Sequence, residues 1–117
     1  MIQITPHCAI FIGINAIDFR CGIDKVANIA EQCSGLDAKS GTMFVFRNKA
    51  RTALKILVYD GRGYWLCHRR LSQGKLKFWP SRGSPQTLVS EELYILIQGG
   101  DPRGVYSPMW RKLDSPR

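Results

Sequence analysis

The fold is decided by residues 53–71, which read ALKILVYDGRGYWLCHRRL. Two strongly apolar runs, Ala53–Tyr59 and Tyr64–Leu71, flank a central Asp-Gly-Arg-Gly, which is a strong turn sequence. The pattern predicts a β-hairpin. A two-residue loop and a four-residue loop both place Tyr59 opposite Tyr64, so the pairing register does not depend on the exact turn.

Alternation along the two strands divides the hairpin into two faces. One face is apolar apart from a single arginine and carries Leu54, Ile56, Val58, Trp65, Cys67, Arg69 and Leu71. The other face is basic and aromatic and carries Lys55, Leu57, Tyr59, Tyr64, Leu66, His68 and Arg70. We predict that the first face, with Trp65 in it, packs on the core, and that the second face is free to meet a ligand.

Apolar periodicity and turn residues predict the remaining elements. We expect strands at Cys8–Gly13, Met43–Arg47 and Lys75–Trp79, and helices over residues 22–34 and 90–98. Together with the hairpin they follow the order β-α-β-β-β-β-α.

The ends of the two helices carry capping residues. Asp18 is expected to cap the start of the first helix, with Arg20 as its local partner, and Gly35 to end that helix. Ser90 is expected to cap the second helix, which has two glutamates in its first turn.

This order of elements indicates an α+β fold. We predict an antiparallel β-sheet of about four to five strands with two helices, in a single basic domain over residues 1–100, followed by an extended tail over 101–117. A length of 117 residues fits one domain. The longest apolar runs fall far short of the roughly 20 residues that a membrane span needs, and no signal peptide is evident. We therefore expect a soluble, cytoplasmic protein with no membrane partner.

The positive charge is concentrated in the centre of the chain. The net charge is +8, yet residues 39–82 alone hold eleven Lys and Arg and a single acid, Asp60. Aromatic residues are interleaved with these cations, and the combination of phosphate-binding cations with flat rings is typical of a nucleic-acid-binding surface. The predicted DNA-binding residues are Arg47, Lys49, Arg51, Lys55, Tyr59, Arg62, Tyr64, His68, Arg69, Arg70, Lys75 and Lys77.

The sequence contains no convincing group of catalytic or metal-binding residues. Its four cysteines have wide, irregular spacings without a CxxC pair. His7–Cys8 and Cys67–His68 would each supply at most one metal ligand, because neighbours on a strand point to opposite faces. Asp18 and Asp24 are close in sequence, but capping explains Asp18 more simply than a two-metal site does. We expect a protein that is not an enzyme and needs no metal or cofactor.

A series of motifs runs in order along the chain. They read DFRCGID (18–24), GTMFVFRN (41–48), LKILVYDG (54–61), YWL (64–66), RRL (69–71), GK (74–75) and FWP (78–80). With the late helix, this series resembles the TnpB-type accessory protein of insertion sequence 66 family elements. The resemblance implies a small protein that is encoded beside the transposase and needed for transposition. It also implies that DDE-type strand transfer belongs to a separate, larger protein.

Two roles within that process stay open at the level of sequence. In the first, the basic sheet face binds DNA and helps the transposase to assemble. In the second, the chain is an adaptor that docks on an acidic surface of the transposase and binds little DNA itself. A small metal-dependent nuclease is a third alternative, for which Mg²⁺-dependent nicking would be the sign.

Overall fold

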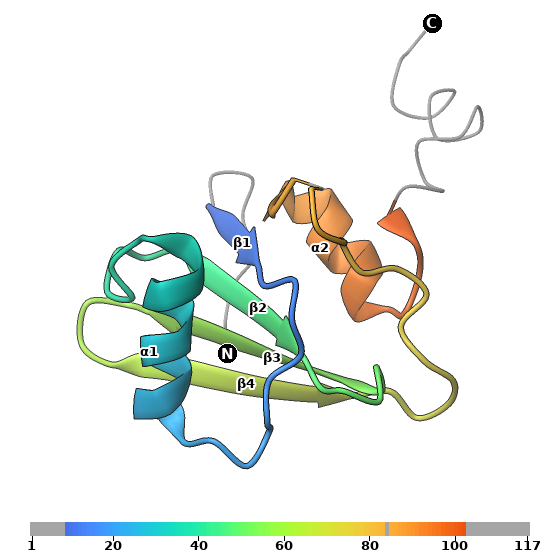
Figure 1. Cartoon of the computed structure of the whole chain (residues 1–117), viewed down its shortest axis with the longest axis horizontal. Helices are drawn as coiled ribbons and strands as arrows, with labels where there is room; N and C mark the ends of the chain where they lie inside the picture. Colours follow the sequence, from blue (N-terminus) through green and yellow to red (C-terminus); the bar gives the residue numbers. More distant parts are fainter. Residues whose placement is uncertain (1–8, 84, 103–117) are drawn as a thin grey trace, which may run out of the picture.

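The computed structural model of the chain describes residues 9–83 and 85–102 (Figure 1). Its elements are β1 (Ile10–Ile12), α1 (Ile23–Ser34), β2 (Met43–Arg47), β3 (Ala53–Tyr59), β4 (Tyr64–Arg70), β5 (Thr87–Leu88) and α2 (Ser90–Ile97). The expected strand start at Cys8 and residues 103–117 of the expected tail lie outside the described residues. Pro102, inside them, is fully buried. Within the described part of the chain, no helix is both long and apolar enough to cross a membrane.

The strands form one mixed sheet in the order β4-β3-β2-β1-β5. β1 and β2 run parallel and are joined through α1, which supplies the long crossover that a parallel pair needs. The other neighbouring strands are antiparallel. The predicted α+β class is therefore confirmed, with one parallel pair in a mostly antiparallel sheet.

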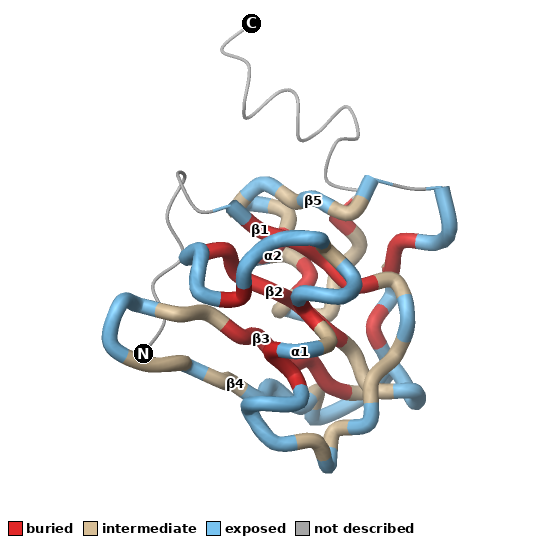
Figure 2. Tube along the Cα trace, turned by 60° about the vertical axis from the view of Figure 1, so that its left-hand side comes forward, coloured by how far each residue is buried: buried red, intermediate tan, exposed pale blue. Residues whose placement is uncertain are grey.

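Both faces of the sheet are covered by a helix, so the fold has three layers (Figure 1). α1 buries Val26 and Ala30 in the same cluster as Phe44 of β2. α2 buries Leu93 and Leu96 in a second cluster on the opposite side of the sheet. The buried stretches follow the central strands β2 and β3, whereas β4 is only partly covered (Figure 2).

The β3–β4 hairpin has the predicted register, with Tyr59 opposite Tyr64. Its Leu54 and Ile56 pack in the cluster with α2, as expected. The prediction that the other face is open is wrong over its centre, where α1 leaves Leu57 completely buried, whereas His68 and Arg70 on the same face are exposed. The β1-α1-β2 crossover is the physical reason, since it lays a helix across that face of the sheet.

The prediction that Trp65 packs in the core is also wrong. Trp65 lies opposite Val58 near the hairpin turn and is 42% exposed, with its indole Nε1 donating to Asp60 Oδ2 at 2.8 Å. A different tryptophan fills the core: Trp79 is 7% exposed, and its Nε1 donates to the Gly13 carbonyl at 2.7 Å.

The segment Lys75–Trp79, predicted as a strand, is irregular in the structure. Its Leu76 backbone N–H donates to the Arg51 carbonyl at 2.7 Å, and the Leu76 side chain is buried in the cluster with α2. The segment thus crosses the end of the hairpin instead of extending the sheet. The fifth strand is β5, which pairs with β1 and was not predicted.

The start of α1 differs from the prediction. Its N-cap is Gly22, and Asp18 makes no cap. Asp18 instead pairs with Arg20, which confirms the predicted local partner. Gly35 ends the helix as predicted, with a left-handed φ of 73°.

The start of α2 is displaced by one residue from the prediction. Val89, not Ser90, is the N-cap. The Val89 backbone N–H donates to the Glu92 carboxylate at 2.9 Å, so one of the two expected glutamates satisfies a backbone donor at the helix start.

Candidate nucleic-acid interface

One end of the sheet gathers most of the predicted DNA-binding residues. At this end β2 and β4 finish and β3 begins, because Ala53 pairs with Arg70 and Leu54 with Arg47. The chain after β4 returns to the same place, where the Leu71 N–H donates to the Thr52 carbonyl at 2.8 Å. We call this surface the basic end. It consists of Arg47, Lys49, Arg51, Arg69, Arg70, Lys75 and Lys77.

Five of these cations are exposed and have no salt-bridge partner among the described residues: Lys49, Arg51, Arg70, Lys75 and Lys77. They come from three segments, namely the β2–β3 turn, the end of β4 and the loop that follows it. Exposed cations without a salt-bridge partner are available to an anionic partner, because no protein carboxylate has to be displaced first.

The other two members of the basic end have structural partners. The Arg47 guanidinium lies 5.8 Å from the centre of the Trp79 ring, and its Nη1 donates to the Asn48 carbonyl at 3.2 Å. Burial lowers the pKa of Arg47 from its ordinary value. Arg69 Nε donates to the Ile97 carbonyl at 2.7 Å, at the C-terminus of α2, where a cation complements the helix dipole.

The β2–β3 turn holds its cations in a defined geometry. Asn48 Oδ1 accepts the backbone N–H groups of Thr52 and Ala53 at 2.9 and 3.1 Å. Asn48 Nδ2 also donates to the Thr52 hydroxyl at 2.9 Å. Arg51 adopts a left-handed backbone with a φ of 62°, which is uncommon for a residue with a side chain. The network around Asn48 compensates for that strain and fixes where Lys49 and Arg51 leave the backbone.

Three of the predicted residues, Tyr59, Arg62 and Tyr64, lie at the opposite end of the hairpin. The seven residues of β3 separate the two ends by about 20 Å. Tyr64 packs against the α1 side of the core, and this burial raises its pKa. Arg62 is exposed on the turn, where its backbone N–H donates to Asp60. These residues do not join the basic end.

Lys55 and His68, from the middle of the hairpin, both contact Phe19. Lys55 is 6% exposed, and its Nζ donates to the Phe19 carbonyl at 2.6 Å and lies 5.0 Å from the centre of the Phe19 ring. His68 meets the same ring edge-on at 5.3 Å. The exposure predicted for Lys55 is therefore wrong. Its charge is used to hold the loop before α1, and we leave it out of the interface.

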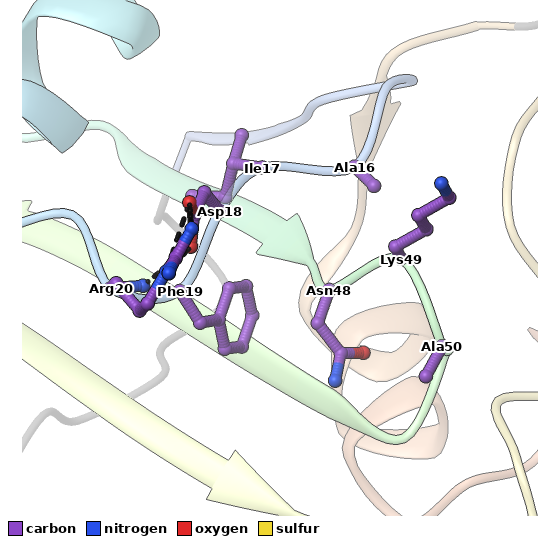
Figure 3. Close-up of a pocket in the computed structure, with 8 residues that line it drawn as sticks. All are labelled: Ala16, Ile17, Asp18, Phe19, Arg20, Asn48, Lys49 and Ala50. Atoms are coloured by element: carbon purple, nitrogen blue, oxygen red, sulfur yellow. Dashed lines mark hydrogen bonds and ion pairs between the residues drawn. The ribbon is translucent and has the colours of Figure 1, made fainter.

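A pocket of about 500 Å³ adjoins the basic end (Figure 3). It lies between the loop that follows β1 and the β2–β3 turn, and its lining is Ala16, Ile17, Asp18, Phe19, Arg20, Asn48, Lys49 and Ala50. Hydrogen bonds from the Arg20 side chain and backbone lower the pKa of Asp18 to about 2, so this carboxylate is ionised at neutral pH.

The sequence motifs did not predict that Phe19 and Arg20 line a pocket. The one available signal was the parallel strand pair, because loops at the carboxyl ends of parallel strands often form a crevice. That signal was missed because an all-antiparallel sheet was expected.

Comparison with known proteins assigns the chain to a family. A family model described as IS66 Orf2-like protein matches residues 8–106. The chain belongs to the IS66 Orf2-like family. The resemblance seen in the sequence motifs is thereby confirmed, and the family connects the chain with transposition by insertion sequences as an accessory protein. The matched range includes the whole basic end and the pocket.

Two relatives in Sinorhizobium fredii match most of the chain. "Uncharacterized protein y4hO" is 32% identical over 104 residues, which covers 88% of this chain and 90% of the relative. "Uncharacterized protein y4jC" is 29% identical over 101 residues, covering 86% of each. No solved structure matches this IS66 Orf2-like chain.

Proposed function

We propose that this IS66 Orf2-like protein binds DNA through the basic end and assists a separate transposase without catalysing strand transfer itself. The observation that carries the proposal is the group of five exposed cations that have no salt-bridge partner among the described residues. Their positive charge is concentrated at one end of the sheet. The single acid of the 39–82 block, Asp60, lies at the other end, in the hairpin turn.

Such a surface recognises the phosphate backbone more than the base sequence. Phosphate contacts supply affinity and register, and they carry no direct sequence information. The proposal therefore assigns the choice of element end or target site to the transposase, while this protein adds affinity and holds the DNA.

A second role, as an adaptor on an acidic surface of the transposase, has its own supporting observation. Tyr94 on α2 is 62% exposed and Trp65 is 42% exposed. Exposed aromatic side chains are typical anchors in protein–protein interfaces. In this alternative the basic end meets carboxylates in place of phosphates.

The salt dependence of DNA binding separates the two roles. The purified protein is titrated into labelled duplexes of unrelated sequence at several salt concentrations. If about five phosphate contacts form, log K should fall against log salt with a slope of about −4 to −5, at similar affinity for each sequence. Absence of binding at low salt would refute the DNA proposal and leave the adaptor role.

A further inference from the structure

The pocket beside the basic end has a place in the fold that suits a ligand. Its walls are the two loops that leave the carboxyl ends of β1 and β2, the parallel pair of the sheet. Crevices at this position are common ligand sites in sheets with parallel strands. Its volume of about 500 Å³ is within the range of small-molecule sites.

The lining combines apolar walls with one cation, Lys49, that has no salt-bridge partner among the described residues. Ala16, Ile17 and Ala50 supply apolar surface, and the close-up shows the Phe19 ring directed across the pocket toward the β2–β3 turn (Figure 3).

Arg20 also lines the pocket, but it forms an ion pair with Asp18, so the pair adds no net positive charge. Arg20 Nε and Nη2 donate to the Asp18 carboxylate at 3.1 and 2.8 Å. Its side chain is nevertheless 91% exposed, and Nη1 makes no hydrogen bond among the described residues. Asp18 is the one carboxylate in the lining, and Arg20 neutralises it.

The loop that carries Phe19 and Arg20 is held by hydrogen bonds to β2 and β3. The buried Lys55 ammonium binds the Phe19 carbonyl at 2.6 Å, and the Ile17 N–H donates to the Arg47 carbonyl at 3.0 Å. The pocket is therefore largely preformed, and a ligand would have little loop ordering to bring about.

From this geometry we infer that the pocket takes one unpaired nucleotide of a DNA strand, with its base against the apolar wall and its phosphate at Lys49. The inference rests on the proposed function and deepens it. A duplex on the basic end would bring a strand end or a splayed base to the mouth of the pocket, since Lys49 belongs to both surfaces. Apolar and aromatic surface beside a cation is the pattern by which proteins hold single-stranded bases.

The test uses the full-length protein and three labelled DNA probes of the same core sequence. One is a blunt duplex, the second carries a short single-stranded extension, and the third carries the same extension with abasic sites. The last two have equal numbers of phosphates, so their difference measures the base alone. We expect the extension with bases to bind about 10-fold more tightly than the abasic extension, in line with the stacking of one base.

Filling the pocket should remove the difference in affinity between the two extended probes, without changing the charge of the protein. Ala50→Leu and Ala16→Leu, on opposite walls, are each expected to bring the two extended probes to equal affinity, while blunt-duplex binding stays at the wild-type value. Ala50→Ser, which keeps the space, is the matched control and should retain the 10-fold difference. Thermal melting of each variant checks that it is folded.

The outcomes separate this inference from the proposed function. Equal binding of the two extended probes by the wild type, with normal blunt-duplex binding, overturns the pocket assignment and leaves the DNA proposal standing. A base-dependent gain that survives both leucine variants also overturns the assignment, because the base must then bind elsewhere. Failure to bind any of the three probes refutes the proposed function itself.

Discussion

Replacing Trp79 by alanine is expected to lower the free energy of unfolding by about 3–5 kcal/mol. The side chain is 7% exposed in the cluster with α2, so its removal leaves a large cavity. It also removes the hydrogen bond to the Gly13 carbonyl and the ring over which Arg47 lies. Urea unfolding, followed by far-ultraviolet circular dichroism, measures the change.

Trp65→Ala is the matched control, because it removes the same side chain from an exposed position. Trp65 is 42% exposed and its side chain makes one hydrogen bond, to Asp60, among the described residues, so we expect a loss of about 1 kcal/mol or less. If Trp65→Ala destabilises the protein as much as Trp79→Ala does, the assignment of the two tryptophans is wrong.

Replacing Lys55 by alanine should cost about 2–4 kcal/mol, although the residue is a charged lysine in a basic block. Its methylenes are buried, and its ammonium satisfies the Phe19 carbonyl and contacts the Phe19 ring. Lys55→Met keeps most of the buried volume and should cost about half as much. Lys49→Ala, at an exposed position, should change stability by no more than about 0.5 kcal/mol.

Denaturant midpoints for these three variants check the prediction. A Lys55→Ala protein as stable as the Lys49→Ala protein would mean that Lys55 is exposed. Lys55 would then be a candidate DNA-binding residue, as the sequence predicted.

The local parts of the fold were predictable from the sequence. The β3–β4 register follows from the Asp-Gly-Arg-Gly turn, and the structure reproduces the pairing of Tyr59 with Tyr64. Gly35 ends α1 where its left-handed conformation is needed. Such features depend on neighbours within a few residues, which is why periodicity and turn chemistry are sufficient to find them.

The parts that depend on distant contacts were not predictable in the same way. Alternation assigns Lys55 and Leu57 to one face, but it does not say that α1 covers that face. Trp65 and Trp79 are both large and apolar, and only the position of α2 decides which of them is buried. The strand expected at Lys75–Trp79 failed for a similar reason, since Leu76 is anchored to the Arg51 carbonyl across the end of the hairpin.

Charge counting selects the 39–82 segment, but it does not tell which of its cations lie together on one surface. The 39–82 block contains every member of the basic end, yet it also contains the buried Lys55 and the distant Arg62. Composition gives the total charge of a segment. Which charges share one surface depends on the direction and register of the strands, and these are known only from the folded structure.

The most direct test of DNA binding at the basic end compares charge removal at the two ends of the hairpin. Lys49→Gln/Arg70→Gln removes two charges from the basic end. Lys39→Gln/Arg62→Gln removes two charges near the hairpin turn, where Lys39 lies over the Tyr59 ring. The slope of log K against log salt for duplex DNA is then measured for both proteins and the wild type. We predict that the first variant flattens the slope by about 2 and that the second leaves it unchanged. An equal loss in both variants, or a larger loss in the second, would contradict the claim that DNA binds at the basic end.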